Sequence, residues 1–160
     1  MSELNSIRLR ELLIYDPSTG VFTWRITQGR MGAGKEAGTD DHGYVKIIIS
    51  RRKYAAHRLA WLYTHNELPT GDIDHINGIR NDNRIENLRD VSRSVNLQNM
   101  RKPKGSNPYL GVTWDKSKNR WLAAITINRR RINLGRFKLP DEAHAAYLEA
   151  KRKLHEGCTI

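Results

Sequence analysis

The segment 71–78, GDIDHING, places a carboxylate beside an imidazole. A neutral imidazole with a pKa near ~6.5 accepts a proton from water, so His75 suits a general base. Asp74 offers an oxygen ligand, and Asn96, on a predicted helix over 92–100, offers a second. Two hard oxygen donors suit Mg²⁺, which keeps several waters and takes the rest of its shell from phosphate. The residue types therefore indicate metal-assisted hydrolysis of a phosphate ester.

The elements around this pair must bring the two side chains together. Neighbouring residues of a strand point to opposite faces, so Asp74 and His75 need a local distortion to share a site. Asn77 and Gly78 follow directly and predict a turn. Polar residues recur over 81–96, which permits a plainer interpretation, in which the Asp-His pair and the asparagines only cap turns.

The run DHINGIRNDNRIENLRDVSRSVNLQN, with AHRLAW upstream, resembles the phage homing-type branch of the HNH endonucleases. The resemblance implies a ββα-metal finger, in which two short strands and a helix surround one divalent ion, Mg²⁺ or Mn²⁺. By position, it implies that His75 is the general base and that Asn87 fixes the loop. Asp74 and Asn96 would then hold the ion, with Asn96 standing where the last histidine of the family motif stands.

Two further residues near this motif have open roles. His57 either orders the active site, contacts phosphate or is a structural histidine of the following helix. Arg84 either contacts DNA or clamps the finger to Glu86 or Asp90. The residue types alone do not separate these alternatives.

Positive charge is concentrated in one part of the chain. The net charge is +11, yet residues 93–137 alone carry eleven Lys and Arg and one acidic residue, while the flanking segments are nearly balanced. Such a concentration indicates nucleic-acid binding, because Lys and Arg that neutralise phosphates release counterions. The alternative is that the charge only keeps the protein soluble.

The composition excludes several kinds of site and several cellular locations. A single cysteine excludes an internal disulfide framework and a zinc site built on several cysteines. No apolar run approaches the ~20 residues that span a bilayer, and the amino terminus lacks the apolar core of a secretion signal. We therefore expect a cytoplasmic protein, in the host cell if a phage encodes it. The sequence indicates no membrane, small-molecule or protein partner.

The carboxyl-terminal third predicts strands over 109–114, 120–128 and 131–137, followed by a helix over 140–156 whose apolar stripe packs on the sheet. The segments YLGVTW, RWLAAITI, RINLGRF and DEAHAAYLEA resemble the Apetala-type (AP2) domain of plant ethylene-response factors, across residues 108–157. The resemblance implies a three-stranded sheet that enters the major groove of DNA while the helix backs it.

Basic and polar residues of the strand face, the turns and the linker are the predicted DNA contacts. Arg131 matches a family arginine used for DNA contact. Thr113 and Thr126 stand where plant relatives place charged residues, so the plant target sequence is not transferred. The predicted set is Arg93, Lys102, Lys104, Thr113, Lys116, Lys118, Arg120, Thr126, Arg129, Arg130, Arg131 and Asn133.

The first part of the chain predicts a helix over 5–14, a strand over 21–27, a glycine-rich loop over 28–43, and a hairpin over 44–56 that leads into a helix over 55–65. The whole chain therefore predicts an α+β fold. Its expected divisions are an amino-terminal extension that contacts DNA (1–55), the nuclease finger (56–100), a basic linker (101–107) and the AP2-type domain (108–157).

The preferred hypothesis is a metal-dependent DNA endonuclease, of the homing type, that acts on double-stranded DNA. The alternative is a sequence-specific DNA-binding regulator whose finger is inactive, and an RNA-binding protein is a third interpretation. The intact set of Asp74, His75 and Asn96 argues against the regulator.

Overall fold

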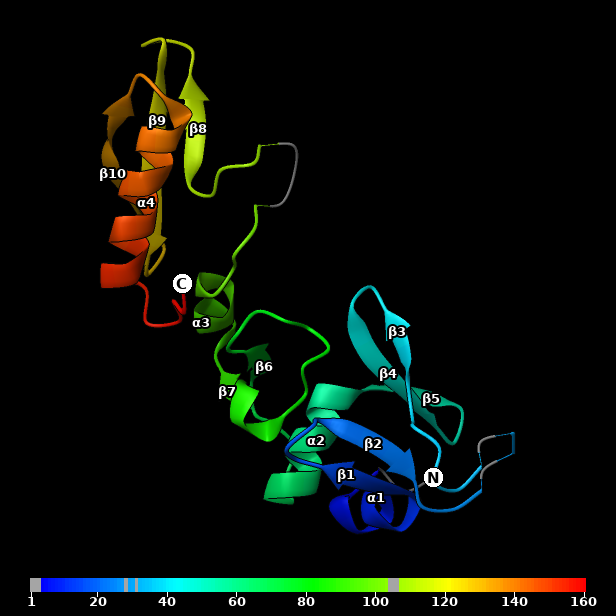
Figure 1. Cartoon of the computed structure of the whole chain (residues 1–160). Helices are drawn as coiled ribbons and strands as arrows, with labels where there is room; N and C mark the ends of the chain where they lie inside the picture. Colours follow the sequence, from blue (N-terminus) through cyan, green and yellow to red (C-terminus); the bar gives the residue numbers. More distant parts are fainter. Residues whose placement is uncertain (1–3, 28, 31, 104–106) are drawn as a thin grey trace. The chain divides into compact units, whose positions relative to one another are not determined.

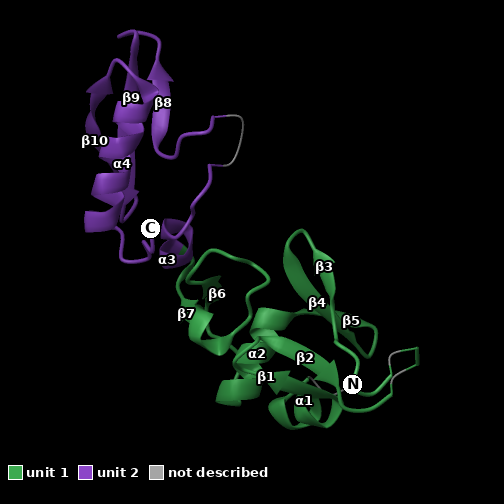
Figure 2. Ribbon diagram, in the orientation of Figure 1, with its two compact units in different colours: residues 1–93 green, residues 94–160 purple. Residues whose placement is uncertain are grey.

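The computed structural model describes residues 4–27, 29–30, 32–103 and 107–160. It divides into two compact units, residues 1–93 and residues 94–160 (Figure 2). Helices and strands occur in both units, which confirms the predicted α+β class. Within these described ranges, no helix combines the length and the apolar character that a membrane span requires.

Two small antiparallel sheets and two helices form the first part of unit 1 (Figure 1). In chain order the elements are α1 (Ser6–Leu12), β1 (Leu13–Asp16), β2 (Val21–Trp24), β3 (Thr39–Asp41), β4 (Tyr44–Ile49), β5 (Arg52–Ala55) and α2 (Ala56–His65). Strands β1 and β2 form one sheet, and β3, β4 and β5 form the other. The predicted hairpin and the helix that follows it are both present.

The structure corrects three boundaries in this part. The predicted helix over 5–14 ends at Leu12, because the next residues form β1 and pair with β2. The predicted strand over 21–27 ends at Trp24, the last residue of β2, which lies opposite Leu13 of β1. The stretch 28–43, expected to be a loop, contains β3. Its polar residues carry no alternating apolar signal, so only pairing with β4 defines this strand.

One hydrophobic core runs through unit 1. Leu9 of α1 and Leu59 of α2 are both buried, and Tyr15 of β1 packs beside them. The same core includes Ile73 and Leu88, which belong to the finger hairpin. The amino-terminal elements and the finger hairpin are therefore stabilised by the same buried apolar surface.

The finger hairpin and a short helix follow α2. Their elements are β6 (Asp72–His75), the 3₁₀ helix η1 (Ile85–Asn87), β7 (Leu88–Val91) and α3 (Arg93–Gln98). Strands β6 and β7 are antiparallel, with Asp74 opposite Arg89 and His75 opposite Leu88. The predicted order of two short strands and a helix is confirmed. All of α3 except its first residue belongs to unit 2.

Unit 2 contains a three-stranded sheet backed by one long helix (Figure 1). Its elements after α3 are β8 (Val112–Asp115), β9 (Arg120–Ile127), β10 (Arg130–Phe137) and α4 (Pro140–Leu154). The strand order is β10-β9-β8, and both pairings are antiparallel. Ala143 and Tyr147 of α4 are buried in the same clusters as Ala123 and Ile125 of β9. The predicted packing of the helix stripe on the sheet is confirmed.

Candidate active site

His75 lies at the end of β6 and is buried, with 5% of its surface exposed. Its Nε2 lies 3.3 Å from Oδ1 of Asn83, which is itself 2% exposed. Donation from Nε2–H to this oxygen selects the tautomer in which Nδ1 is basic. Burial lowers the pKa of His75, which keeps the imidazole neutral at pH 7. A neutral, oriented imidazole is the form that a general base requires.

A second histidine packs against the first. The ring of His57, at the start of α2, meets the ring of His75 nearly at right angles, with the centroids 5.2 Å apart. Tyr44 of β4 packs on both rings, with centroid distances of 5.6 and 6.0 Å. Burial lowers the pKa of His57 to about 3, so this histidine also stays neutral. Of its three open roles, the geometry supports the one in which His57 orders the His75 ring.

Asp74 is buried and paired across the hairpin. Its Oδ2 accepts hydrogen bonds from Nε and Nη2 of Arg89, at 2.9 and 2.7 Å. The register explains the pair, because the two residues lie opposite each other on β6 and β7. The guanidinium offsets the cost of burying the carboxylate charge. Sequence reasoning missed Arg89, because no residues were assigned to the second strand of the finger, and the register of β7 is what places Arg89 opposite Asp74.

Asn87 closes the loop between the two strands. Its Oδ1 accepts a hydrogen bond from the backbone N–H of Asn77 at 2.9 Å, and its Nδ2 donates to the backbone carbonyl of Asp82 at 2.8 Å. Its own carbonyl accepts a hydrogen bond from the backbone N–H of Ile76 at 2.9 Å. One buried residue therefore joins both ends of the loop that follows His75, as a loop-fixing asparagine must.

Arg84 binds two carboxylates beside this loop. Its Nε and Nη2 donate to Oδ1 and Oδ2 of Asp82 at 2.9 and 2.8 Å, and its Nη1 donates to Glu86 at 2.7 Å. Of the roles left open for Arg84, the structure shows the clamp, made to Asp82 and Glu86 and not to Asp90. The Arg84 hydrogen bonds hold the pKa of Asp82 at about 2.

Asp82→Asn is expected to reduce stability at neutral pH by on the order of 1 kcal/mol, because the ion pair with Arg84 is partly exposed and screened. Since folding lowers the pKa of Asp82 from 3.8 to about 2, its contribution is present above pH 4 and is lost as pH falls toward 2. Chemical denaturation across this range should show the two proteins converging at low pH. Glu67→Gln, at an exposed carboxylate, is the control, and a gap between Asp82→Asn and parent that stays constant down to pH 2 would contradict the linkage.

The amino-terminal hairpin supports the loop that holds His75. The hydroxyl of Tyr15 donates a buried hydrogen bond to the backbone carbonyl of Asn83 at 2.7 Å. The carbonyl of Pro17 accepts a hydrogen bond from the backbone N–H of Ile85 at 3.3 Å. Sequence reasoning assigned this region only to an extension that contacts DNA, and missed its contact with the partner of His75.

Gly20 brings the same hairpin against the loop backbone. Its φ is +76°, and a Cβ at this position would lie 2.5 Å from the backbone N of Arg84 and from the carbonyl carbon of Asn83. Only glycine combines a positive φ with so close an approach. Residues of β1 and of the β1–β2 turn therefore position the residue whose side chain contacts His75.

The two predicted metal ligands lie on different elements of the fold. Asp74 offers a carboxylate on β6, and Asn96, on α3 in unit 2, offers an amide oxygen. Among the described residues, no three His, Cys, Asp or Glu side chains gather closely enough to hold a metal ion.

Most of the predicted DNA contacts lie at exposed positions of unit 2. Arg120 is half-buried, Lys102 is exposed between α3 and β8, and Lys104 lies outside the described residues. Arg93 donates from Nη1 to Oδ2 of Asp72 at 2.9 Å, within unit 1. The exposed positions on the sheet and its turns are Thr113, Lys116, Lys118, Thr126, Arg129, Arg130, Arg131 and Asn133.

Two hairpin turns hold an arginine in the left-handed conformation. In the β9–β10 turn, Asn128 and Arg129 have φ of 49° and 64°, and in the β4–β5 turn, Ser50 and Arg51 have φ of 49° and 68°. Two consecutive positive φ values are typical of type I′ turns, which favour Asn and Gly. The conformation costs a residue with a Cβ about 1 kcal/mol. Both arginines are exposed at the tips of their hairpins.

Two known families match separate parts of the chain. A family model of HNH endonucleases matches residues 54–98, and a model of the AP2 domain matches residues 108–157. Over 103 residues, the chain is 30% identical to Protein 3.8 of Escherichia phage T7, and the match covers 62% of this chain and 83% of that relative. The chain belongs to the family of this phage protein, and it contains an HNH endonuclease domain and an AP2 domain. No solved structure matches it.

The HNH endonuclease match contains β6, η1, β7 and α3, and so includes each candidate catalytic and metal-binding residue. It does not include the amino-terminal hairpin that supports Asn83. The AP2 match covers β8 to β10 and α4, and indicates DNA as the partner. HNH endonucleases generally depend on a divalent metal ion. Family membership thus supports a nuclease that binds DNA.

Proposed function

We propose that this HNH endonuclease hydrolyses phosphodiester bonds of double-stranded DNA at a recognised site, in a homing-type role. The observation that carries the proposal is the buried His75, which Asn83 orients within the HNH match. The AP2 domain supports DNA as the substrate. The phage relative supports action in the cytoplasm of a host cell.

Each candidate residue has a distinct task in this proposal. His75 takes the proton from the attacking water at Nδ1, while its Nε2–H stays directed at Asn83. Asn87 holds the loop and does not contact substrate. Asp74 and Asn96 would hold one Mg²⁺ or Mn²⁺, and for Asn96 the support is its spacing in the motif. The ion, when bound, stabilises negative charge on the scissile phosphate and the departing oxygen.

Cleavage of supercoiled plasmid and of genomic DNA tests the proposal. The protein is incubated with each DNA in Mg²⁺, in Mn²⁺ and in EDTA, and gel retardation is measured in parallel. We expect cut products with either ion and none in EDTA. Retardation without any cleavage under both ions would instead support the DNA-binding regulator with an inactive finger.

Neutralising Arg129, Arg130 and Arg131 together is expected to weaken DNA binding and to flatten its salt dependence. Each lost phosphate contact reduces the magnitude of the slope of log K against log salt by about one. The control neutralises two lysines away from this turn, Lys138 before α4 and Lys153 on its last turns. Binding titrations at several salt concentrations measure the slope. An unchanged slope in the triple variant would remove this turn from the interface.

A further inference from the structure

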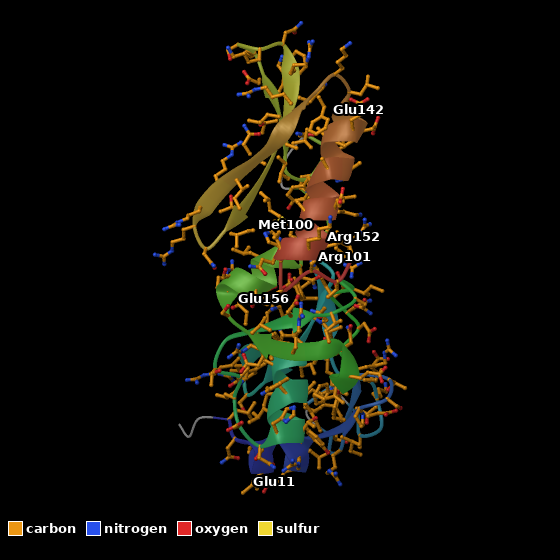
Figure 3. The ribbon with its side chains drawn as sticks, turned by 90° about the vertical axis from the view of Figure 1, so that its left-hand side faces the viewer. Glu11, Met100, Arg101, Glu142, Arg152 and Glu156 are labelled. Carbon is orange, nitrogen blue, oxygen red and sulfur yellow. The ribbon has the colours of Figure 1, made fainter. Side chains whose placement is uncertain are left out.

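The carboxyl-terminal end of unit 2 contacts the end of helix α3. Lys151 of α4 is 1% exposed, and its Nζ donates a hydrogen bond to the backbone carbonyl of Met100, just after α3. Met100, Arg101, Arg152 and Glu156 gather at the same end of α4, away from Glu142 at the other end (Figure 3). A buried lysine is costly unless its ammonium is hydrogen-bonded, so the Met100 contact accounts for its burial.

Gly157 makes the closest approach to α3. Its backbone N–H donates to Oε1 of Gln98 at 3.0 Å. A Cβ at this position would lie 2.2 Å from the carbonyl oxygen of Val95 and 3.0 Å from Cβ of Gln98. A side chain at residue 157 would therefore push the tail away from the backbone of α3.

The last residues add a second set of contacts to the segment after α3. Nη2 of Arg101 donates to the carbonyl oxygen and to Oγ1 of Thr159, at 3.2 and 2.7 Å. The hydroxyl of Thr159 donates to Oδ1 of Asn99 at 2.5 Å. Together with Lys151 and Gly157, these residues hold α3 from its middle to its end.

Helix α3 depends on such contacts for its conformation. It has six residues, and none of them is fully buried. Isolated helices shorter than ~12–15 residues are marginal in water, so packing and not local propensity keeps α3 helical. Asn96 lies on this helix, between the two residues that Gly157 approaches.

We propose that Lys151, Gly157 and Thr159 form a clasp that positions α3, and with it Asn96, within unit 2. The inference rests on the proposed function, in which Asn96 is a metal ligand. The consequence is that metal affinity depends on residues that touch neither the metal nor DNA.

Gly157→Ala tests the clasp, with Glu156→Ala as the control at the neighbouring exposed position. Amide hydrogen exchange of residues 93–98 should rise on the order of tenfold in Gly157→Ala, while exchange in β9 stays at the parental rate. The Mn²⁺ concentration that half-saturates binding, followed by titration without DNA, should rise as well. Affinity for DNA should stay unchanged, and Glu156→Ala should match the parent in every measurement.

Lys151→Met gives a second, independent variant, with Lys153→Met as its exposed control. Replacing a buried lysine by a residue of similar volume need not lower global stability, yet α3 should again exchange faster. Parental exchange of α3 in both clasp variants would overturn the clasp. Faster exchange with unchanged Mn²⁺ binding would overturn the positioning of Asn96. Absence of cleavage by the parent would count against the proposed function alone, because exchange and Mn²⁺ binding are measured without DNA.

Discussion

Replacing His75 by alanine is expected to lower the rate of DNA cleavage about 10²–10⁴-fold, the usual contribution of a positioned general base. Affinity for DNA should stay at the parental value, because His75 is buried and the basic positions lie elsewhere. Single-turnover cleavage rates and binding titrations on the same DNA separate the two effects. The variant removes the base without removing Asp74 or its partner Arg89.

His65→Ala is the matched control, because His65 is an exposed histidine at the end of α2. It should cleave at the parental rate. The pH profile gives a further check: cleavage needs neutral His75, and burial lowers its pKa. The acid limb of the rate profile should therefore lie below pH ~6.5, the ordinary value for histidine. Parental cleavage by His75→Ala would end the assignment of His75 as the base.

Gly20→Ala is expected to destabilise unit 1 by about 2–5 kcal/mol. The positive φ costs a residue with a Cβ about 1–2 kcal/mol, and a Cβ 2.5 Å from the backbone of Asn83 and Arg84 adds overpacking of about 1–3 kcal/mol. Because Asn83 contacts His75, the surviving folded protein should also cleave DNA more slowly. Thermal unfolding and cleavage below the melting transition measure the two effects.

Gly34→Ala is the control that separates the cost of a positive φ from the cost of a Cβ that meets the loop backbone. Gly34 has a φ of +80°, close to that of Gly20, but a Cβ there would meet no heavy atom within 4 Å among the described residues. The Gly34→Ala variant should therefore be destabilised only by the cost of the backbone conformation. It should keep full cleavage activity. Equal destabilisation by the two substitutions would show that Gly20 does not brace the loop.

The sequence was most informative where structure follows from local pattern. In β9, Ala123 and Ile125 share one face and alternate with less buried neighbours, and both are buried beneath α4, as predicted. The finger hairpin was likewise predictable, because Asn77 and Gly78 mark its turn and a 3₁₀ helix then returns the chain to β7. Strand β3 was missed because it owes its conformation to its neighbour and not to its own residues.

The candidate site was only partly predictable for the same reason. His75 and Asn87 stand out by residue type and spacing, whereas Asn83 was one polar residue among many. Its contact with Tyr15 joins residues that are 68 positions apart in the chain, and no local pattern encodes that meeting. The partners of Arg84, by contrast, are its neighbours in the sequence. Residue type alone did not show whether Arg84 binds these carboxylates or contacts DNA.

The left-handed turns at Arg51 and Arg129 have a consequence for how this protein can be changed. Glycine at either position would relieve about 1 kcal/mol of backbone strain. A laboratory selection for heat resistance alone should therefore collect glycine at these tips, and a selection for tight DNA binding should remove it. Each hairpin tip therefore gives up about 1 kcal/mol of stability and presents an exposed cationic side chain in return.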